Sequence, residues 1–182
     1  MKNAIKFSFL IVFLCLLFAG CEKIKSIADV TFDAEFTADL PVDVVPTSLK
    51  AGVNGTFFET ATIDPLSNSD LATYADKIKK IEVIEASAEV LSIDPSPVLL
   101  LSTTLSATSG VFSPATWSFN NESLTVGKII TLDNENSQFS NLQSILDSKE
   151  IFTVTLQGQT DVDEASFTVR VKYKTKVTAN PL

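Results

Sequence analysis

The chain has 182 residues, with 14 lysines and arginines, 22 aspartates and glutamates and no histidine, which gives a net charge of −8 at pH 7. This acidic balance argues against nucleic acid binding, which depends on clustered basic side chains that neutralise phosphates. The lack of histidine, with only two cysteines in the chain, excludes Ser-His-Asp and Cys-His nucleophile systems and the usual zinc, haem and iron–sulfur sites.

The N-terminus has the pattern of an export signal. Two lysines precede an apolar run, Phe7–Phe18, and two small residues then stand directly before Cys21. The run is shorter than the about 20 residues of a membrane-spanning helix and fits the apolar part of a secretory signal. The stretch Leu17–Cys21 resembles the lipobox of bacterial lipoproteins, with Phe18 where that family more often has leucine. The resemblance implies that residues 1–20 are a signal peptide and that Cys21 is acylated.

Acylation would place the protein at a membrane. Acyl chains such as palmitate anchor a domain because each buried methylene contributes about 0.8 kcal/mol. The resemblance implies a lipid-anchored protein of the bacterial cell envelope, at the outer membrane, on its periplasmic or its surface side. With its acidic β-rich body, the chain also resembles uncharacterised β-sandwich lipoproteins of Bacteroidota-type envelopes. We expect a signal peptide at 1–20, a lipidated tether at 21–28 and a single domain at 29–182.

Alternating residues predict strands in the first part of the domain. Residues 30–37 alternate between apolar and polar, the pattern of a half-buried strand. Residues 40–45 continue extended, and Pro41 indicates an edge or a bend because proline cannot donate to a ladder. Asn54-Gly55 between two apolar runs predicts a hairpin with a type I′ turn.

The middle of the chain predicts a short helix followed by a bulged strand. Ser69 is a candidate N-cap for a helix with Leu71 on its apolar face. The strand over residues 79–91 changes phase near Val83-Ile84, which predicts a β-bulge. The bulge is expected to point six residues inward: Ile81, Val83, Ile84, Ala86, Ala88 and Val90.

The rest of the chain predicts more strands and one more helix. After a strand over residues 98–107, a short strand is expected around Trp117 and a longer one over 124–132. Ser140 is a candidate cap for a helix, and strands follow over 152–156 and 167–177. Eight to ten short strands predict an all-β, mainly antiparallel fold, a two-sheet Ig-like or Greek-key sandwich with one or two short helices. A closed β-barrel is the alternative.

Two features are candidate partner-binding sites. Arg170, Lys172, Lys174 and Lys176 form a basic ladder about 7 Å apart on one face of the last strand. The ladder would either dock an anionic partner or form a solvated face that pairs with acids on neighbouring strands. Trp117, the only tryptophan, would stack on a sugar or a partner if exposed, and would pack in the core if it lies in a strand.

No pattern predicts a cofactor or a metal. Asp133–Asn136 and Asp161–Glu164 are oxygen-rich turns of the kind that could hold calcium, but neither has EF-hand spacing. Asn and Asp are also common in turns for conformational reasons. A pair of carboxylates could serve a glycosidase, but 22 acids bring some pair to the required separation in any fold.

The sequence therefore predicts a non-catalytic, membrane-anchored envelope lipoprotein, a protein- or glycan-interaction or structural module. The alternative is a carrier of a small apolar or amphipathic ligand. The carrier would need a closed cavity lined by residues such as Phe57, Phe58, Phe152 and Phe167.

Overall fold

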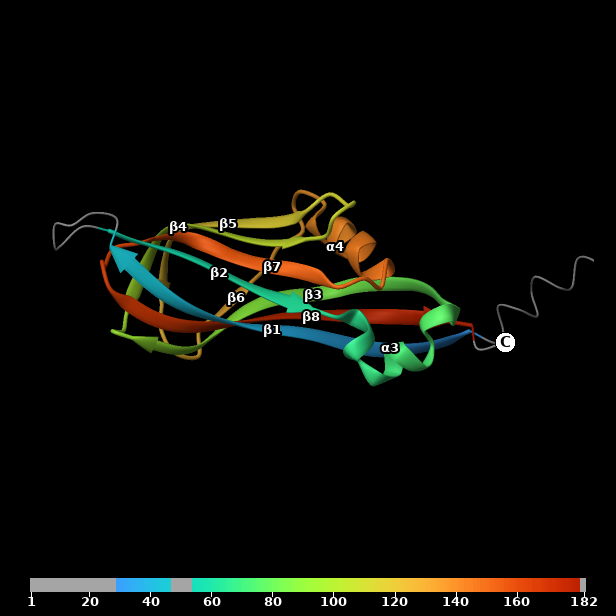
Figure 1. The fold of residues 1–182 in the computed structure, drawn as a ribbon. Helices are drawn as coiled ribbons and strands as arrows, with labels where there is room; N and C mark the ends of the chain where they lie inside the picture. Colours follow the sequence, from blue (N-terminus) through green and yellow to red (C-terminus); the bar gives the residue numbers. More distant parts are fainter. Residues whose placement is uncertain (1–28, 47–53, 181–182) are drawn as a thin grey trace, which may run out of the picture.

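The computed structural model describes residues 29–46 and 54–180, which form mainly antiparallel β-structure (Figure 1). The strands are β1 Val30–Pro46, β2 Gly55–Ile63, β3 Ile78–Asp94, β4 Val98–Thr108, β5 Ala115–Leu124, β6 Ile129–Thr131, β7 Phe152–Thr160 and β8 Ala165–Ala179. The helices are η1 Pro65–Ser67, α3 Ser69–Thr73, η2 Ala75–Lys77 and α4 Gln138–Asp147. The predicted all-β class is confirmed. The expected signal, tether and Cys21 lie outside the described residues.

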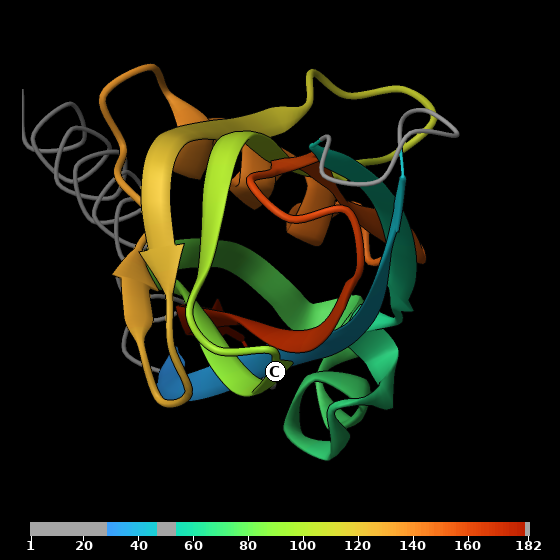
Figure 2. The same cartoon turned by 90° about the vertical axis from the view of Figure 1, so that its left-hand side faces the viewer.

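Hydrogen bonding connects the strands into one curled sheet, in the order β5-β4-β7-β2-β1-β8-β3-β6. Figure 2 shows the sheet curling round into a half-barrel. The sheet ends at β5 and β6 and does not close, so the described strands do not form the closed barrel. We call β1, β8, β3 and β6 the β8 half, and β2, β7, β4 and β5 the β7 half. In the described part of the chain, the halves are joined where Val45 pairs with Thr56 and Pro46 with Gly55.

The core lies between the inner faces of the two halves. Phe57 of β2 and Phe167 of β8 meet edge to face, with ring centroids 5.4 Å apart. Trp117 of β5 stacks on Tyr173 of β8 at 6.3 Å. Fully burying a large apolar side chain contributes about 1.5–3 kcal/mol. These contacts therefore stabilise the packing of the two halves away from the β1–β2 junction, where no β-ladder hydrogen bonds join the described strands of the two halves.

Strand β1 shows why one long alternating segment forms a single strand. It pairs with β8 without a register break from Val30 to Val44, and its buried residues alternate along the strand. Pro41 lies within it, opposite Thr168. Because β1 meets β2 at only its last residues, most of its other side is an edge, where proline is tolerated.

Helix α4 packs against β3 and β5. It buries Leu142, Ile145 and Leu146, the apolar face that the sequence predicts. The helix begins at Gln138, two residues before the predicted cap Ser140. The N-cap residue is Ser137, whose side chain makes no capping hydrogen bond. Asn134 Oδ1 instead accepts a hydrogen bond from the Phe139 N–H in the first turn, at 2.8 Å.

Two local predictions are corrected. Gly55 is the first residue of β2 and its φ is not positive, so it is not the second residue of a type I′ turn. Residues 47–53 of the expected hairpin lie outside the described chain. The predicted bulge occurs between Val83 and Glu85, but Ile84 is 51% exposed. Ile84 is a bulge residue that points outward, and the other five predicted residues are buried.

Candidate functional site

The basic ladder on β8 lies between two rows of acids. Arg170 stands opposite Asp39 of β1 and Glu89 of β3, and Lys174 opposite Glu35 and Glu85. Because β8 is an inner strand of the sheet, both of its sides carry such partners. The same face holds several acids beside the four basic residues: Asp33, Glu35, Asp39, Glu82, Glu85 and Glu89.

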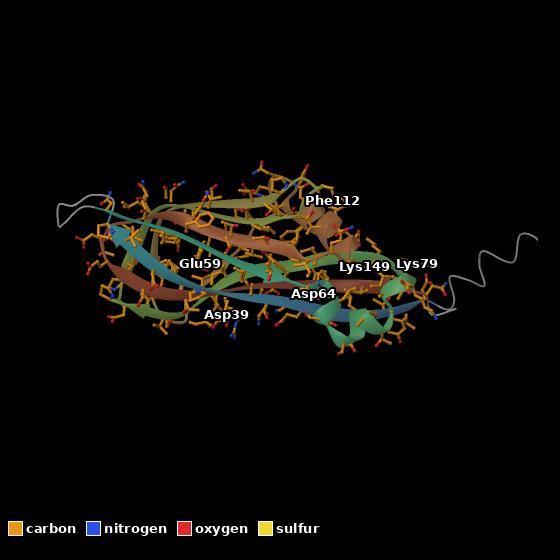
Figure 3. The ribbon with its side chains drawn as sticks, viewed as in Figure 1. Asp39, Glu59, Asp64, Lys79, Phe112 and Lys149 are labelled. Atoms are coloured by element: carbon orange, nitrogen blue, oxygen red, sulfur yellow. The ribbon has the colours of Figure 1, made fainter. Side chains whose placement is uncertain are left out.

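The ladder forms ion pairs across the strands. Arg170 donates from Nε to Asp39 Oδ1 at 2.7 Å and from Nη2 to Oδ2 at 2.8 Å. This hydrogen bonding holds the pKa of Asp39 below its usual value. Lys172 pairs with Glu35 at 3.3 Å and Lys174 with Glu85 at 3.0 Å. Figure 3 shows Asp39 on β1. The geometry therefore favours a self-paired surface over a stripe for an anionic partner.

Trp117 lies in the core. Its side chain is 3% exposed, and its Nε1 donates to the Asp133 carbonyl oxygen at 2.7 Å. Of the two roles that the sequence leaves open for Trp117, the partner-binding role needs an exposed ring, which this buried side chain does not provide. Its place in β5, opposite Leu105, gives it the core role instead.

The acidic turns are used in local hydrogen bonds. Asp161 Oδ1 accepts from the Leu99 N–H at 2.8 Å, and Asp133 Oδ1 accepts from Gln138 Nε2 at 3.3 Å. Across residues 29–46 and 54–180, no three His, Cys, Asp or Glu side chains gather in a way that could hold a metal ion.

The outer face of the β7 half has a different chemistry, which the sequence interpretation missed. Burial alternates along β2 and β7, along β4 from Ser102 onward and along β5 as far as Asn120, and the outward positions of these segments carry hydroxyl, amide and one phenyl group. We call this surface the charge-free face, because none of its residues is ionisable at neutral pH. Its residues are Thr56, Phe58, Thr60, Thr62, Ser102, Thr104, Ser106, Thr108, Thr116, Ser118, Asn120, Thr153, Thr155, Gln157 and Gln159.

A groove crosses the charge-free face. Two rows of directly opposed residues line it: Phe58, Gln157, Thr104, Ser118 in one and Thr56, Gln159, Ser102, Asn120 in the other. The volume of the groove is ≈ 590 Å³. Phe58 is 67% exposed, so an aromatic ring stands free among polar groups.

The backbone beneath the groove is irregular. The pairing of β4 with β7 shifts register between Leu100 and Ser102, which marks a β-bulge beside the groove. Gly158 lies in its floor, and a Cβ there would meet the Ser102 carbonyl and lie 2.6 Å from Thr103 Oγ1. Glycine therefore lets β7 approach β4 closely at this point.

A cavity among the described core residues is small by comparison. A cavity between the halves, lined by residues such as Val90, Leu105 and Phe167, has a volume of ≈ 20 Å³. That is about the room for one water molecule. Of the residues expected to line a carrier cavity, Phe57, Phe152 and Phe167 are packed in the core, and Phe58 lies outside.

Comparisons with known proteins give no family. No family model matches the chain, and no curated protein does. Among solved structures, the crystal structure of the decameric BFDV capsid protein is similar with a TM-score of 0.44 and 7% sequence identity. The match covers 81% of this chain and 99% of that chain, and a similarity of this degree carries no argument about function.

Proposed function

We propose that this chain is a non-catalytic, membrane-anchored lipoprotein of the bacterial cell envelope, whose domain is an interaction module for a protein or a glycan. In this proposal the two halves of the sheet act as the two layers of a Greek-key sandwich. The observation that carries it is the contrast between the outer groove of ≈ 590 Å³ and the interior cavity of ≈ 20 Å³. A binding partner therefore has room in the outer groove, whereas this interior cavity holds about one water molecule.

The position of the groove supports the same proposal. Strand β1 starts at Val30 and ends at Pro46, which pairs with Gly55 at the start of β2. At about 3.3 Å per residue, the length of β1 from Val30 to Pro46 is about 50 Å. The groove residue Thr56 thus lies at the end of the domain opposite Val30 (Figure 1). A domain tethered through Cys21 would present the groove away from the bilayer.

Anchoring is tested with a Cys21→Ser variant of the full chain, produced in a bacterium that processes lipoproteins. We expect the wild type in the membrane fraction and the variant in the soluble fraction, because serine lacks the thiol that is acylated. Cys15→Ser is the matched control, since Cys15 lies in the expected signal, and it should leave retention unchanged. Membrane retention of Cys21→Ser would disprove the lipid anchor.

The interaction module is tested against the carrier alternative by native mass spectrometry of the protein after gentle release from the membrane. The expected mass is that of the processed, acylated chain with no further small apolar molecule. A stoichiometric lipid or other apolar ligand beyond the acyl chains would refute the module and support the carrier alternative.

A further inference from the structure

We propose that the groove on the charge-free face binds a neutral glycan, an inference that rests on the proposed role of the domain as an interaction module. Its binding residues are Phe58 as a stacking platform and the amides of Gln157, Gln159 and Asn120 as hydrogen-bonding groups.

The absence of charge on this face indicates which class of ligand fits the groove. Charged residues make up 20% of the chain, yet none is among the residues that line the groove. An anionic polymer would find no cation there, and a basic segment would find no carboxylate. Protein interfaces usually have an apolar centre rich in aromatic side chains, whereas Phe58 is the one exposed apolar side chain in the groove lining. A neutral, polar ligand is the best match.

The hydrogen-bonding groups suit sugar hydroxyls. An amide both donates and accepts, and so does a serine or threonine hydroxyl, which is also the capacity of each hydroxyl of a sugar. In the part of the chain that the structure describes, no hydrogen bond engages the side-chain amides of Gln157, Gln159 or Asn120. These amides therefore remain available for a ligand.

Phe58 supplies the apolar contact. Its ring is 67% exposed and stands beside Gln157 across the β2–β7 pair. One face of a pyranose ring presents C–H groups, which pack on an aromatic ring, while its hydroxyls point outward to polar partners. The pairing of one phenyl ring with surrounding amides and hydroxyls matches this amphipathic character.

The length of the groove across the strands indicates that its ligand is a chain of sugars. Its rows cross four strands, from Phe58 on β2 to Ser118 on β5. Three inter-strand spacings of about 4.8 Å give about 14 Å. That length exceeds a single sugar ring, so we infer an oligosaccharide or a segment of a polysaccharide.

The test is binding of the purified, unacylated Cys21→Ser chain, lacking residues 1–20, to an array of neutral oligosaccharides. The array contains hexoses, pentoses, deoxyhexoses and N-acetylhexosamines, with sulfated and uronic acid glycans beside them. We expect binding to at least one neutral glycan. Its Kd should be unchanged between 50 mM and 500 mM NaCl, because no ionic contact is there to be screened.

Variants then place the binding in the groove. Phe58→Ala should raise the Kd about tenfold, since the loss of an aromatic contact of about 1.4 kcal/mol corresponds to a factor of ten. Gln157→Ala should also weaken binding. Ile84→Ala is the matched control, because Ile84 is an exposed apolar residue on the β8 half, and it should leave the Kd unchanged. Trp117 fluorescence checks that each variant is folded.

Three results would overturn the inference: no binding to any neutral glycan, binding only to anionic glycans with loss at high salt, or binding that Phe58→Ala and Gln157→Ala leave unchanged. A photocrosslinker at position 58 distinguishes failure of the glycan inference from failure of the proposed interaction module. If it captures an envelope protein while the array shows no binding, the glycan inference falls and the interaction module stands.

Discussion

Tyr173 carries a hydroxyl group into a core that offers it no partner. The side chain is fully buried, between the rings of Trp117 and Phe152, and its hydroxyl has no hydrogen-bond partner among the described residues. Burial raises the pKa of Tyr173 well above its ordinary value. Two residues along the same strand, Thr175 donates from Oγ1 to the Ala34 carbonyl oxygen at 3.0 Å. Of these two buried hydroxyls, that of Thr175 has a hydrogen-bond partner and that of Tyr173 has none among the described residues.

Removing these hydroxyls should have opposite effects. Tyr173→Phe should raise the free energy of unfolding by about 1 kcal/mol, because it removes a buried polar group that is not hydrogen-bonded. Thr175→Val should lower it by about 1 kcal/mol, since it leaves the Ala34 carbonyl without that donor. Urea denaturation followed by Trp117 fluorescence measures both. A loss of stability in Tyr173→Phe would show that the hydroxyl has a partner.

At the scale of elements, a carboxylate at the end of helix α4 adds a hydrogen bond to the sheet beside the apolar packing of the helix. Asp147, the last residue of α4, accepts a hydrogen bond from the Ile81 N–H of β3 at 3.0 Å. Burial raises the pKa of Asp147, and the bond from Ile81 opposes that rise. The folded state therefore binds the Asp147 proton more tightly than the unfolded state, for which the pKa is about 3.9. The corresponding contribution to stability is complete below that value and is lost as pH rises through the folded-state pKa.

Two variants separate the hydrogen bond from the charge. Asp147→Ala should lower the free energy of unfolding by about 1 kcal/mol at pH 7, because the Ile81 N–H loses its acceptor. Asp147→Asn keeps an acceptor and cannot ionise. Its stability relative to the wild type should therefore increase as pH rises from about 4. Denaturation at a series of pH values tests this, and a difference that decreases with pH would contradict the raised pKa.

At the scale of the whole molecule, the two halves of the sheet are joined at a narrow place. Gly55 pairs with Pro46, and its N–H donates to the Val162 carbonyl oxygen at 2.8 Å. A Cβ at position 55 would meet Val44 Cγ1 and would lie 2.6 Å from the Val162 oxygen. The small size of glycine, and not its conformational freedom, is what this position requires.

Gly55→Ala should therefore disturb the junction. We expect the free energy of unfolding to fall by about 1–3 kcal/mol, the usual cost of inserting atoms into a packed site. Gly110→Ala is the control, because a Cβ there would meet nothing within 4 Å, and it should change stability little. Calorimetric unfolding of the two variants compares them, and equal melting temperatures would rule out the crowded junction.

Much of the fold could be predicted from local patterns. Three features depend on residues close together in the chain, so composition and spacing reveal them. They are the alternation in β1 and β8, the bulge after Val83 and the apolar face of α4. Ile84 shows the limit, because an apolar residue in a bulge can face either way until the neighbouring strand sets the register. The lipobox at Cys21 remains a prediction, since it lies outside the described residues.

The candidate site could not be predicted in this way. The sequence by itself determined the all-β class, the lack of His-dependent chemistry and the basic ladder, because each depends on composition or on a period of two. Only the tertiary structure decided that Arg170 meets Asp39, 131 residues away, and that Trp117 is buried. It also brought Phe58, Gln157 and Asn120 to one groove. The order of strands in a sheet is set by packing between distant segments, which no local spacing records.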